Sequence, residues 1–416
     1  MKVDDRRVTV RSSAPTKSKA NRPIPLVVYI LAVGTFTMLT TEFIVAGILT
    51  QLAAELEISV ARAGLLITVF AAGMVIGAPL MALLTLRLPQ KITLILALTV
   101  FAAGHVVVAL GSNFTLLMVA RFVTALATGA FWAIAGVVAA KSAGPGMASR
   151  ALGIINAGGM LATVLGVPLG AFASQYFGWR GSFWGLAVLA AISALLIARY
   201  VPHNTSKHSQ VSVVGEIAGL RSLRLWLTLA ACATTTGGVL SAYSYISPLL
   251  IDGTGFSEAA IPLVLIGFGV GSLVGSLIGG RLGDAHPHLL TFIAPATSTV
   301  VLVLIGLLAN LQLPMIILIT LLGFFGLGAN PILASLAIKY GDKSPTLASS
   351  LTVAGFNLGT TVASWLGSKS LESSLGTTGP VVVGASIAVL TLIPVIILAI
   401  MANSARTASA AGLIHS

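Results

Sequence analysis

The chain has 416 residues, of which 56% are apolar and only 8% are charged, and its mean hydropathy is +1.02. A soluble protein keeps about a quarter of its residues charged, so this composition excludes a soluble globular protein. The formal net charge of +12 suggests nucleic-acid binding at first sight, but the distribution of the basic residues explains it differently.

Apolar segments of about 20 residues, each long enough to cross a hydrocarbon core of about 30 Å, recur along the chain. They predict twelve membrane-spanning helices at residues 26–50, 63–86, 91–110, 115–140, 150–173, 182–201, 225–249, 260–281, 289–309, 315–338, 348–370 and 380–402. The first of them is too long for a secretory signal and lacks a small-residue cleavage site, so it is expected to stay as a helix.

The longest polar interruption, residues 202–222, divides the spans into six and six. The predicted units are a disordered basic tail, a six-helix bundle, a linker, a second six-helix bundle and a second tail, at 1–22, 23–201, 202–224, 225–402 and 403–416. With the first tail assigned to the cytoplasm, 19 Lys and Arg residues lie inside and three outside. This split follows the positive-inside rule, which predicts that both termini are cytoplasmic and argues against nucleic-acid binding.

The two halves repeat each other. Residues of spans two and eight match at an offset of 198, and residues of spans five and eleven match at an offset of 201. The matches are Phe70, Gly73 and Gly77 with Phe268, Gly271 and Gly275, and Asn156, Gly158 and Gly166 with Asn357, Gly359 and Gly367. Because each half has an even number of spans, the halves are parallel repeats, an arrangement typical of transporters whose site lies between them.

Three stretches carry a resemblance to a known family: "TTEF" (40–43), "ARFVTALATGAFWA" (120–133) and "VLGVPLGAFASQYFGWRGSFW" (164–184). They resemble the twelve-helix drug:proton antiporter branch of the major facilitator superfamily, especially its chloramphenicol exporters and arabinose or other sugar-efflux permeases. The resemblance covers about 26–402. It implies an all-α polytopic membrane protein of two pseudo-symmetric six-helix bundles. It also implies an antiporter motif that bends the fifth helix and seals the cytoplasmic half, formed by Gly158, Gly166, Pro168 and Gly170.

The loop after span two departs from the family pattern Gly-x-x-x-Asp-Arg-x-Gly-Arg-Arg. In "ALLTLRLPQK" (82–91) Leu86 stands at the Asp position, although the basic Arg87 and Lys91 are present. The second copy, "GRLGDAHPH" (280–288), keeps Gly280 and Asp284. The gating charge contacts are therefore expected to be weaker at the first loop or to reside on Asp284. Chloramphenicol exporters also have a basic, Pro-containing first loop.

Glu42 is the only acid inside any predicted span. A buried charge at mid-span costs about 2.5–3.5 kcal/mol on insertion scales, so such residues usually mark a pathway. At 1.5 Å per residue, Glu42, Arg121 and His105 lie about 12, 9 and 8 Å below the outer surface, in one layer. Because burial disfavours a charged carboxyl and a nearby cation favours it, we predict that Glu42 carries a proton and Arg121 holds it ionised. His105 is a candidate relay. The alternatives are a structural Glu42–Arg121 pair and a hydrogen-bonded histidine.

Polar and aromatic residues at mid-depth are the candidates for the substrate cavity. Asparagine offers both a donor and an acceptor, and aromatic rings offer flat apolar contact. The candidates are Trp132, Asn156, Tyr243, Tyr245, Asn330 and Asn357. Asn156 and Asn357 occupy matching positions in the repeats, which predicts opposite cavity walls. Hydrogen bonding between helices is the alternative role, and for the tyrosines so is the aromatic belt.

These features favour a proton-coupled efflux transporter in a bacterial inner membrane that exports a small organic compound, acting as a monomer. A neutral amphenicol-like drug ranks first as the substrate, a sugar second and a cationic dye third. The alternatives are a sugar permease and a non-transporting membrane sensor. No P-loop is present, so ATP is not expected to drive transport. The single cysteine, Cys232, excludes disulfides, and the spans hold no metal-ligand cluster or paired acids, so no metal, cofactor or enzymatic activity is expected.

Overall fold

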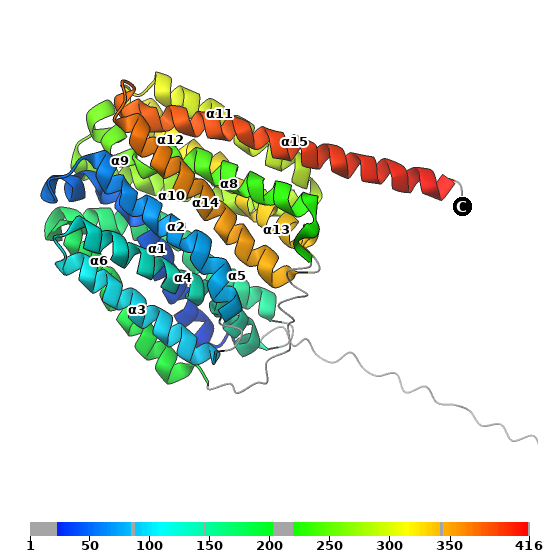
Figure 1. The fold of residues 1–416 in the computed structure, drawn as a ribbon, viewed down its shortest axis with the longest axis horizontal. Helices are drawn as coiled ribbons and strands as arrows, with labels where there is room; N and C mark the ends of the chain where they lie inside the picture. The colour runs from blue at the N-terminus through cyan, green and yellow to red at the C-terminus, as the bar shows by residue number, and fades with distance from the viewer. Residues whose placement is uncertain (1–22, 85–87, 145–146, 203–218, 342–343, 415–416) are drawn as a thin grey trace, which may run out of the picture.

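The computed structural model describes residues 23–84, 88–144, 147–202, 219–341 and 344–414 (Figure 1). The predicted tail 1–22, most of the predicted linker and Arg87 lie outside these residues. Within them the chain is built from helices, as predicted.

The first half runs from α1 to α6. Its elements are α1 (Leu26–Glu55), α2 (Val60–Leu84), α3 (Gln90–Leu110), α4 (Phe114–Ala143), α5 (Ala148–Leu161), the π-helix η3 (Ala162–Gly166) and α6 (Val167–Tyr200). Gly178 divides α6, because its φ of 65° lies in the left-handed region that favours glycine. The chain turns back there, and the Ser182 hydroxyl donates to the Gly170 carbonyl across the two arms at 2.7 Å. The segment therefore makes two crossings, as predicted for spans five and six.

The second half runs from α8 to α15. Its elements are η4 (Gly219–Arg221), α8 (Leu223–Ser244), α9 (Ile246–Pro248), η5 (Leu249–Gly253), η6 (Glu258–Ala260), α10 (Ile261–Ala285), α11 (Pro287–Leu307), α12 (Gln312–Gly328), α13 (Asn330–Tyr340), α14 (Pro345–Leu371), η7 (Gly376–Thr378) and α15 (Gly379–Ile414). The helix α15 continues through most of the segment predicted as a tail, and Figure 1 shows its end projecting from the bundle.

Among the described residues, ten helical segments are long and apolar enough to cross a membrane. One of them, Arg150–Tyr200, contains the turn at Gly178 and makes two crossings. The helix α14 makes the twelfth crossing, packed against α2 and α8. Large apolar side chains on the outer surface, among them Leu195, Leu263 and Leu307, are more than two-thirds exposed, which suits contact with lipid. The predicted twelve-helix fold is confirmed.

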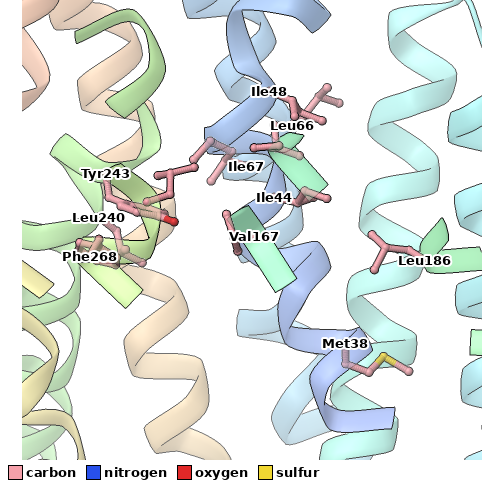
Figure 2. Close-up of a cluster of buried hydrophobic side chains, with 14 of the residues drawn as sticks. Met38, Ile44, Ile48, Leu66, Ile67, Val167, Leu186, Leu240, Tyr243 and Phe268 are labelled. Atoms are coloured by element: carbon pink, nitrogen blue, oxygen red, sulfur yellow. The ribbon is translucent and has the colours of Figure 1, made fainter. Parts of the chain in front are cut away.

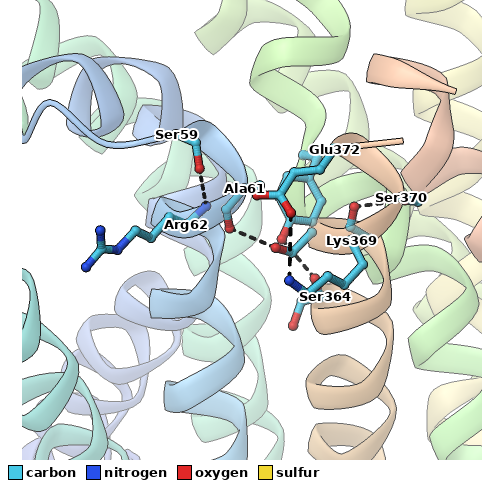
Figure 3. A network of polar contacts seen from close by, with 10 residues as sticks. Ser59, Ala61, Arg62, Ser364, Lys369, Ser370 and Glu372 are labelled. Atoms are coloured by element: carbon cyan, nitrogen blue, oxygen red, sulfur yellow. Dashed lines mark hydrogen bonds and ion pairs between the residues drawn. The ribbon is translucent and has the colours of Figure 1, made fainter. Parts of the chain in front are cut away.

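The two halves meet along α2 and α14 on one side and along α10, α5 and η3 on the other (Figure 1). Hydroxyl groups bond across both lines of contact. Thr68 and Ser364 share a hydrogen bond of 2.8 Å, and Thr163 and Ser272 share one of 3.4 Å. Figure 3 shows one end of the first contact line, where Ser364 of α14 lies beside Ala61 at the start of α2. There the Ser368 hydroxyl donates to the Ala61 carbonyl at 3.0 Å.

We call the end of the molecule that holds the Gly178 turn the distal end. There the halves are joined by five residues that we call the distal gate: Thr50, Gln51, Gln175, Ser247 and Glu258. Thr50 and Ser247 share a hydrogen bond of 3.2 Å. The side-chain amides of Gln51 and Gln175 donate to Glu258, to its carboxylate at 3.3 Å and to its carbonyl at 2.9 Å. A cavity of about 450 Å³ opens beside these bonds.

The ion pairs between described residues do not cross the distal gate. Arg180 pairs with Glu55 inside the first half. Lys369 pairs with Glu372 inside the second half at 3.7 Å (Figure 3). Within the described part of the chain, the gate is therefore closed by hydroxyl and amide groups and one carboxylate, without a Lys or Arg partner from the opposite half.

Candidate functional site

Glu42 faces the boundary between the two halves. It lies near the middle of α1, is half-buried, and lines a small cavity with Phe43 and Phe70 of the first half and with Tyr243 and Thr360 of the second. In the described ranges the carboxyl makes no hydrogen bond or ion pair with protein. The predicted proton carrier therefore lies between the halves rather than against the lipid, and its carboxyl oxygens can still accept hydrogen bonds.

Arg121 of α4 is held beside Glu42 but not on it. Its side chain is 1% exposed, and Nη1 donates to both the carbonyl and the hydroxyl of Thr41, at 3.0 and 2.9 Å. Nε donates to the Leu66 carbonyl of α2 at 3.4 Å, and the guanidinium lies 4.2 Å from the centre of the Phe70 ring. Between described residues there is no Arg121–Glu42 ion pair within 4.0 Å, so the predicted pairing is not a direct contact in this structure.

His105 of α3 joins the same group of residues. Its Nε2 lies 2.7 Å from the Thr41 hydroxyl, and its Nδ1 lies 2.7 Å from the Phe101 carbonyl. The imidazole is stacked on the Phe101 ring at 4.0 Å and is 1% exposed. The structure thus brings the three ionisable residues of the predicted layer together around Thr41.

Two of the predicted cavity residues lie at the boundary near Glu42. Tyr243 of α8 is stacked on Phe268 at 4.2 Å, and Figure 2 shows its hydroxyl pointing toward the side on which α1 and α2 present Ile44 and Ile67. Asn357 of α14 lies one helical turn from Thr360, which lines the cavity, and is 4% exposed. Its Nδ2 donates to a carbonyl of its own helix at 3.0 Å, whereas its Oδ1 has no partner among the described residues.

Tyr245 is placed differently from the expectation. Its hydroxyl donates to the Ser364 carbonyl at 2.8 Å, and its ring packs against Gly64 of the first half and Gly367 of the second. A side chain at Gly64 would collide with the tyrosine. Tyr245 therefore packs between the halves toward the distal end and does not line the cavity beside Glu42.

The other predicted cavity residues lie outside the group that lines the Glu42 cavity. Trp132 is half-buried in α4, near Gly159 of α5. Asn156 is exposed on α5, unlike its buried repeat counterpart. Asn330 is half-buried at the first residue of α13, and its Oδ1 has no partner among the described residues. Their predicted roles stay predictions.

The residues of the predicted antiporter motif pack along α1. A Cβ atom at Gly158 would meet the Ala32 carbonyl, one at Gly166 would meet the Thr40 side chain, and one at Gly170 would meet Ile44. Pro168 lies in the first turn of α6, directly after the π-helix η3. These residues thus bring α5 and α6 close to the stretch of α1 that carries Glu42, and the π-helix η3 lies between Gly158 and Pro168.

The predicted gating residues are only partly described. Lys91 is 9% exposed near the start of α3. Gly280 lies in α10, where its nearest neighbour across the helix interface is Pro331. Asp284 belongs to α10, but its side chain lies outside the described part of the structure, as does all of Arg87. Their gating role stays a prediction.

Sequence reasoning missed the role of Thr41 and all residues of the distal gate. Thr41 is part of the "TTEF" stretch, so its position next to the only acid of a span was a usable signal. Gln51, Gln175 and Glu258 lie near span ends, where polar residues are common, and their sequence carried no such signal.

Comparisons with known proteins agree with this architecture. The family model described as the Major Facilitator Superfamily matches residues 31–267 and 229–413. A chloramphenicol resistance protein of Streptomyces lividans is 30% identical over 360 residues, which cover 86% of this chain and 92% of that protein. The inner membrane transport protein YdhP of Escherichia coli K12 is 30% identical over 365 residues, covering 87% and 93%.

Among solved structures, a bacterial homologue of the human lysosomal transporter Spinster, in an inward-facing and unoccupied conformation, has a TM-score of 0.68. The sequences are 13% identical, and the match covers 91% of this chain and 96% of that one. At this identity the likeness concerns the fold.

Proposed function

Because the chain belongs to the Major Facilitator Superfamily, a family of membrane transporters, we propose that it exports a small organic compound in exchange for protons. The compound and the protons would use one central site that opens alternately to the two sides of the membrane, as in transporters built from two repeated halves.

The observation that carries this proposal is the place of Glu42. Its carboxyl lies at the boundary of the two halves, in a cavity lined by both, and has no protein partner among the described residues. An acid in a membrane span is costly and usually serves a pathway. A carboxyl that is half-buried beside an arginine can change its charge as its surroundings change, which is the property that proton coupling requires.

The closed distal gate supports a conformational assignment. If the positive-inside rule holds for this chain, its termini are cytoplasmic and the distal end faces the outside. The gate bonds of Gln51, Gln175 and Glu258 then hold the outer side closed, so the proposed conformation is one in which the central site does not open to the outside.

A disulfide across the distal gate is expected to stop transport. In the double variant Thr50→Cys with Ser247→Cys, the two side chains replace hydroxyls that lie 3.2 Å apart, so oxidation should join the halves. The native Cys232 is fully buried and should not compete. We expect transport to fall to background after oxidation and to return after reduction, while either single variant stays active. Full activity of the oxidised, cross-linked protein would refute opening at this end.

In this conformation the cavity beside Glu42 has a volume of about 10 Å³, so a compound would enter only after the halves move apart. The side chains around it favour a neutral compound with hydroxyl or amide groups. Phe43, Phe70 and Tyr243 offer apolar faces, and Ser244 and Thr360 offer hydroxyls beside the single carboxyl. We therefore place an amphenicol-like drug first, in line with the resistance protein of Streptomyces lividans, and a sugar second. The alternative of a membrane sensor that does not transport gives no reason for an acid at the boundary of the two halves.

Efflux is tested in an efflux-deficient bacterium and in everted membrane vesicles. The expressed protein should lower the susceptibility to chloramphenicol, and an imposed pH gradient should drive the drug into the vesicles. Arabinose in the same assay tests the sugar alternative. If neither compound nor any member of a broader drug panel moves in response to a pH gradient, the exporter proposal fails.

A further inference from the structure

Thr41 differs from the three threonines that precede it in α1. Thr35, Thr37 and Thr40 each donate to the carbonyl four residues earlier in α1, at 3.0, 2.9 and 2.7 Å. Thr41 is fully buried, and its hydroxyl instead bonds outward, to His105 and Arg121. This hydroxyl is therefore committed to a link between three helices, α1, α3 and α4.

Donor and acceptor roles in this link are fixed by chemistry. A guanidinium only donates, so the Thr41 oxygen accepts from Arg121 Nη1. A carbonyl only accepts, so His105 Nδ1 carries the proton that it donates to the Phe101 carbonyl. Nε2 of the neutral ring is then an acceptor, and the Thr41 proton points to it. A neutral histidine therefore gives each ring nitrogen one hydrogen-bond partner, and every bond in the link has one donor and one acceptor.

The link determines where Arg121 points. Its Nη1 is bound twice by Thr41, its Nε is bound by the Leu66 carbonyl, and its face rests on Phe70. A bidentate pair with a carboxylate is the strongest contact that an arginine makes, and Glu42 is the next residue after Thr41. Yet that pair is absent between the described residues, and Nη2 is left without a partner. The guanidinium is thus restrained near the acid without being bound to it.

We propose that Thr41, anchored by a neutral His105, is a positioning residue that keeps Arg121 from closing on the Glu42 carboxylate. This inference rests on the proposed role of Glu42 in transport. The restraint leaves the carboxyl free to take up and release a proton. His105 keeps its single proton on Nδ1, accepts the Thr41 hydroxyl at Nε2, and does not pass the transported proton on. Among described titratable groups, those that face this part of α1 are Arg121 from α4, His105 from α3 and Tyr243 from α8.

The matched variants Thr41→Val and Thr41→Ser test the restraint. Valine keeps the shape and removes the hydroxyl, whereas serine keeps the hydroxyl. The readout is the infrared band of the protonated Glu42 carboxyl, followed against pH in the purified protein and identified by its loss in Glu42→Gln. Thr41→Val removes one of the two acceptors of Arg121 Nη1 and keeps the Thr41 carbonyl. With its hold on the guanidinium loosened, the arginine should close on the carboxylate and shift the titration midpoint toward acid by about one pH unit. Thr41→Ser should titrate as the wild type does. An unshifted midpoint in Thr41→Val overturns the proposal.

A second pair of variants tests the hydrogen bond between His105 and the Thr41 hydroxyl. This pair can also refute the proposal if Thr41→Val does not fold. The amide oxygen that His105→Gln introduces would accept from the Thr41 hydroxyl, whereas His105→Leu offers no acceptor. We expect His105→Gln to titrate like the wild type and His105→Leu to shift as Thr41→Val does. If His105 instead relayed the transported proton, both replacements would abolish proton-driven transport to the same extent. Because the infrared titration needs no substrate, a failure of the efflux proposal would leave this result interpretable.

Discussion

Replacing Glu42 by glutamine is expected to abolish proton-driven efflux while leaving the protein folded. Glutamine has nearly the same shape and fits the half-buried position in α1, but an amide cannot bind and release a proton. In everted vesicles with an imposed pH gradient, Glu42→Gln should accumulate no more substrate than vesicles without the protein. Exchange of substrate down its own gradient is expected to survive, because the cavity lining is otherwise intact.

The matched control for this variant is Glu372→Gln. Glu372 is half exposed in an ion pair with Lys369, and such surface pairs contribute about 0–1 kcal/mol. This variant should pump like the wild type. If Glu42→Gln still concentrates substrate at the expense of the pH gradient, Glu42 is not the proton carrier, although the fold assignment would stand.

The largest expected effect on stability comes from Gly158→Val. A Cβ atom at this position would collide with the carbonyl of Ala32, which is backbone and cannot rotate away. The helices α1 and α5 would have to separate, and overpacking of this kind costs about 3 kcal/mol. The measurement is the thermal unfolding of the purified protein, together with its yield in the membrane.

Gly153→Val is the control within the same helix. A Cβ atom at Gly153 meets nothing within 4 Å, and the change in helix propensity is the same as at position 158. We expect Gly153→Val to unfold close to the wild-type temperature. Equal destabilisation by the two variants would show that close approach to α1 is not what position 158 requires.

Much of the architecture was predictable because membrane helices leave a strong signal in sequence. Length and apolarity located the crossings, including the two that the turn at Gly178 separates within one helical segment. The rise per residue also placed Glu42, Arg121 and His105 at one depth, and the structure brings the last two together through Thr41.

The depth of a residue in the membrane does not tell which way its side chain points around the helix axis. This explains the expectations that differ from the structure. Arg121 lies at the height of Glu42, but its side chain is directed to the neighbouring Thr41. Tyr245 lies two residues after Tyr243, directly after the end of α8, where its backbone is no longer helical, and it packs between the halves instead of at the cavity. Which face a residue occupies depends on how helices from both halves pack, and that information is spread over the whole chain.

Repeat symmetry has a similar limit. Asn156 and Asn357 occupy matching positions, but the first is exposed and the second is buried. Each half is packed against the other and not against a copy of itself, so equivalent positions meet different neighbours. The repeat predicted the backbone arrangement and did not predict the surroundings of its side chains.

The composition of the distal gate bears on how easily the two halves can part. Coulombic attraction in a low-dielectric setting falls off slowly, so ion pairs pull over several ångströms. Hydroxyl and amide bonds weaken steeply once their atoms move beyond about 3.5 Å, and water replaces them at little net cost. The distal gate consists of Thr50, Ser247, two glutamines and Glu258. We therefore expect its bonds to be lost after only a small tilt of the two halves and to form again when the halves return.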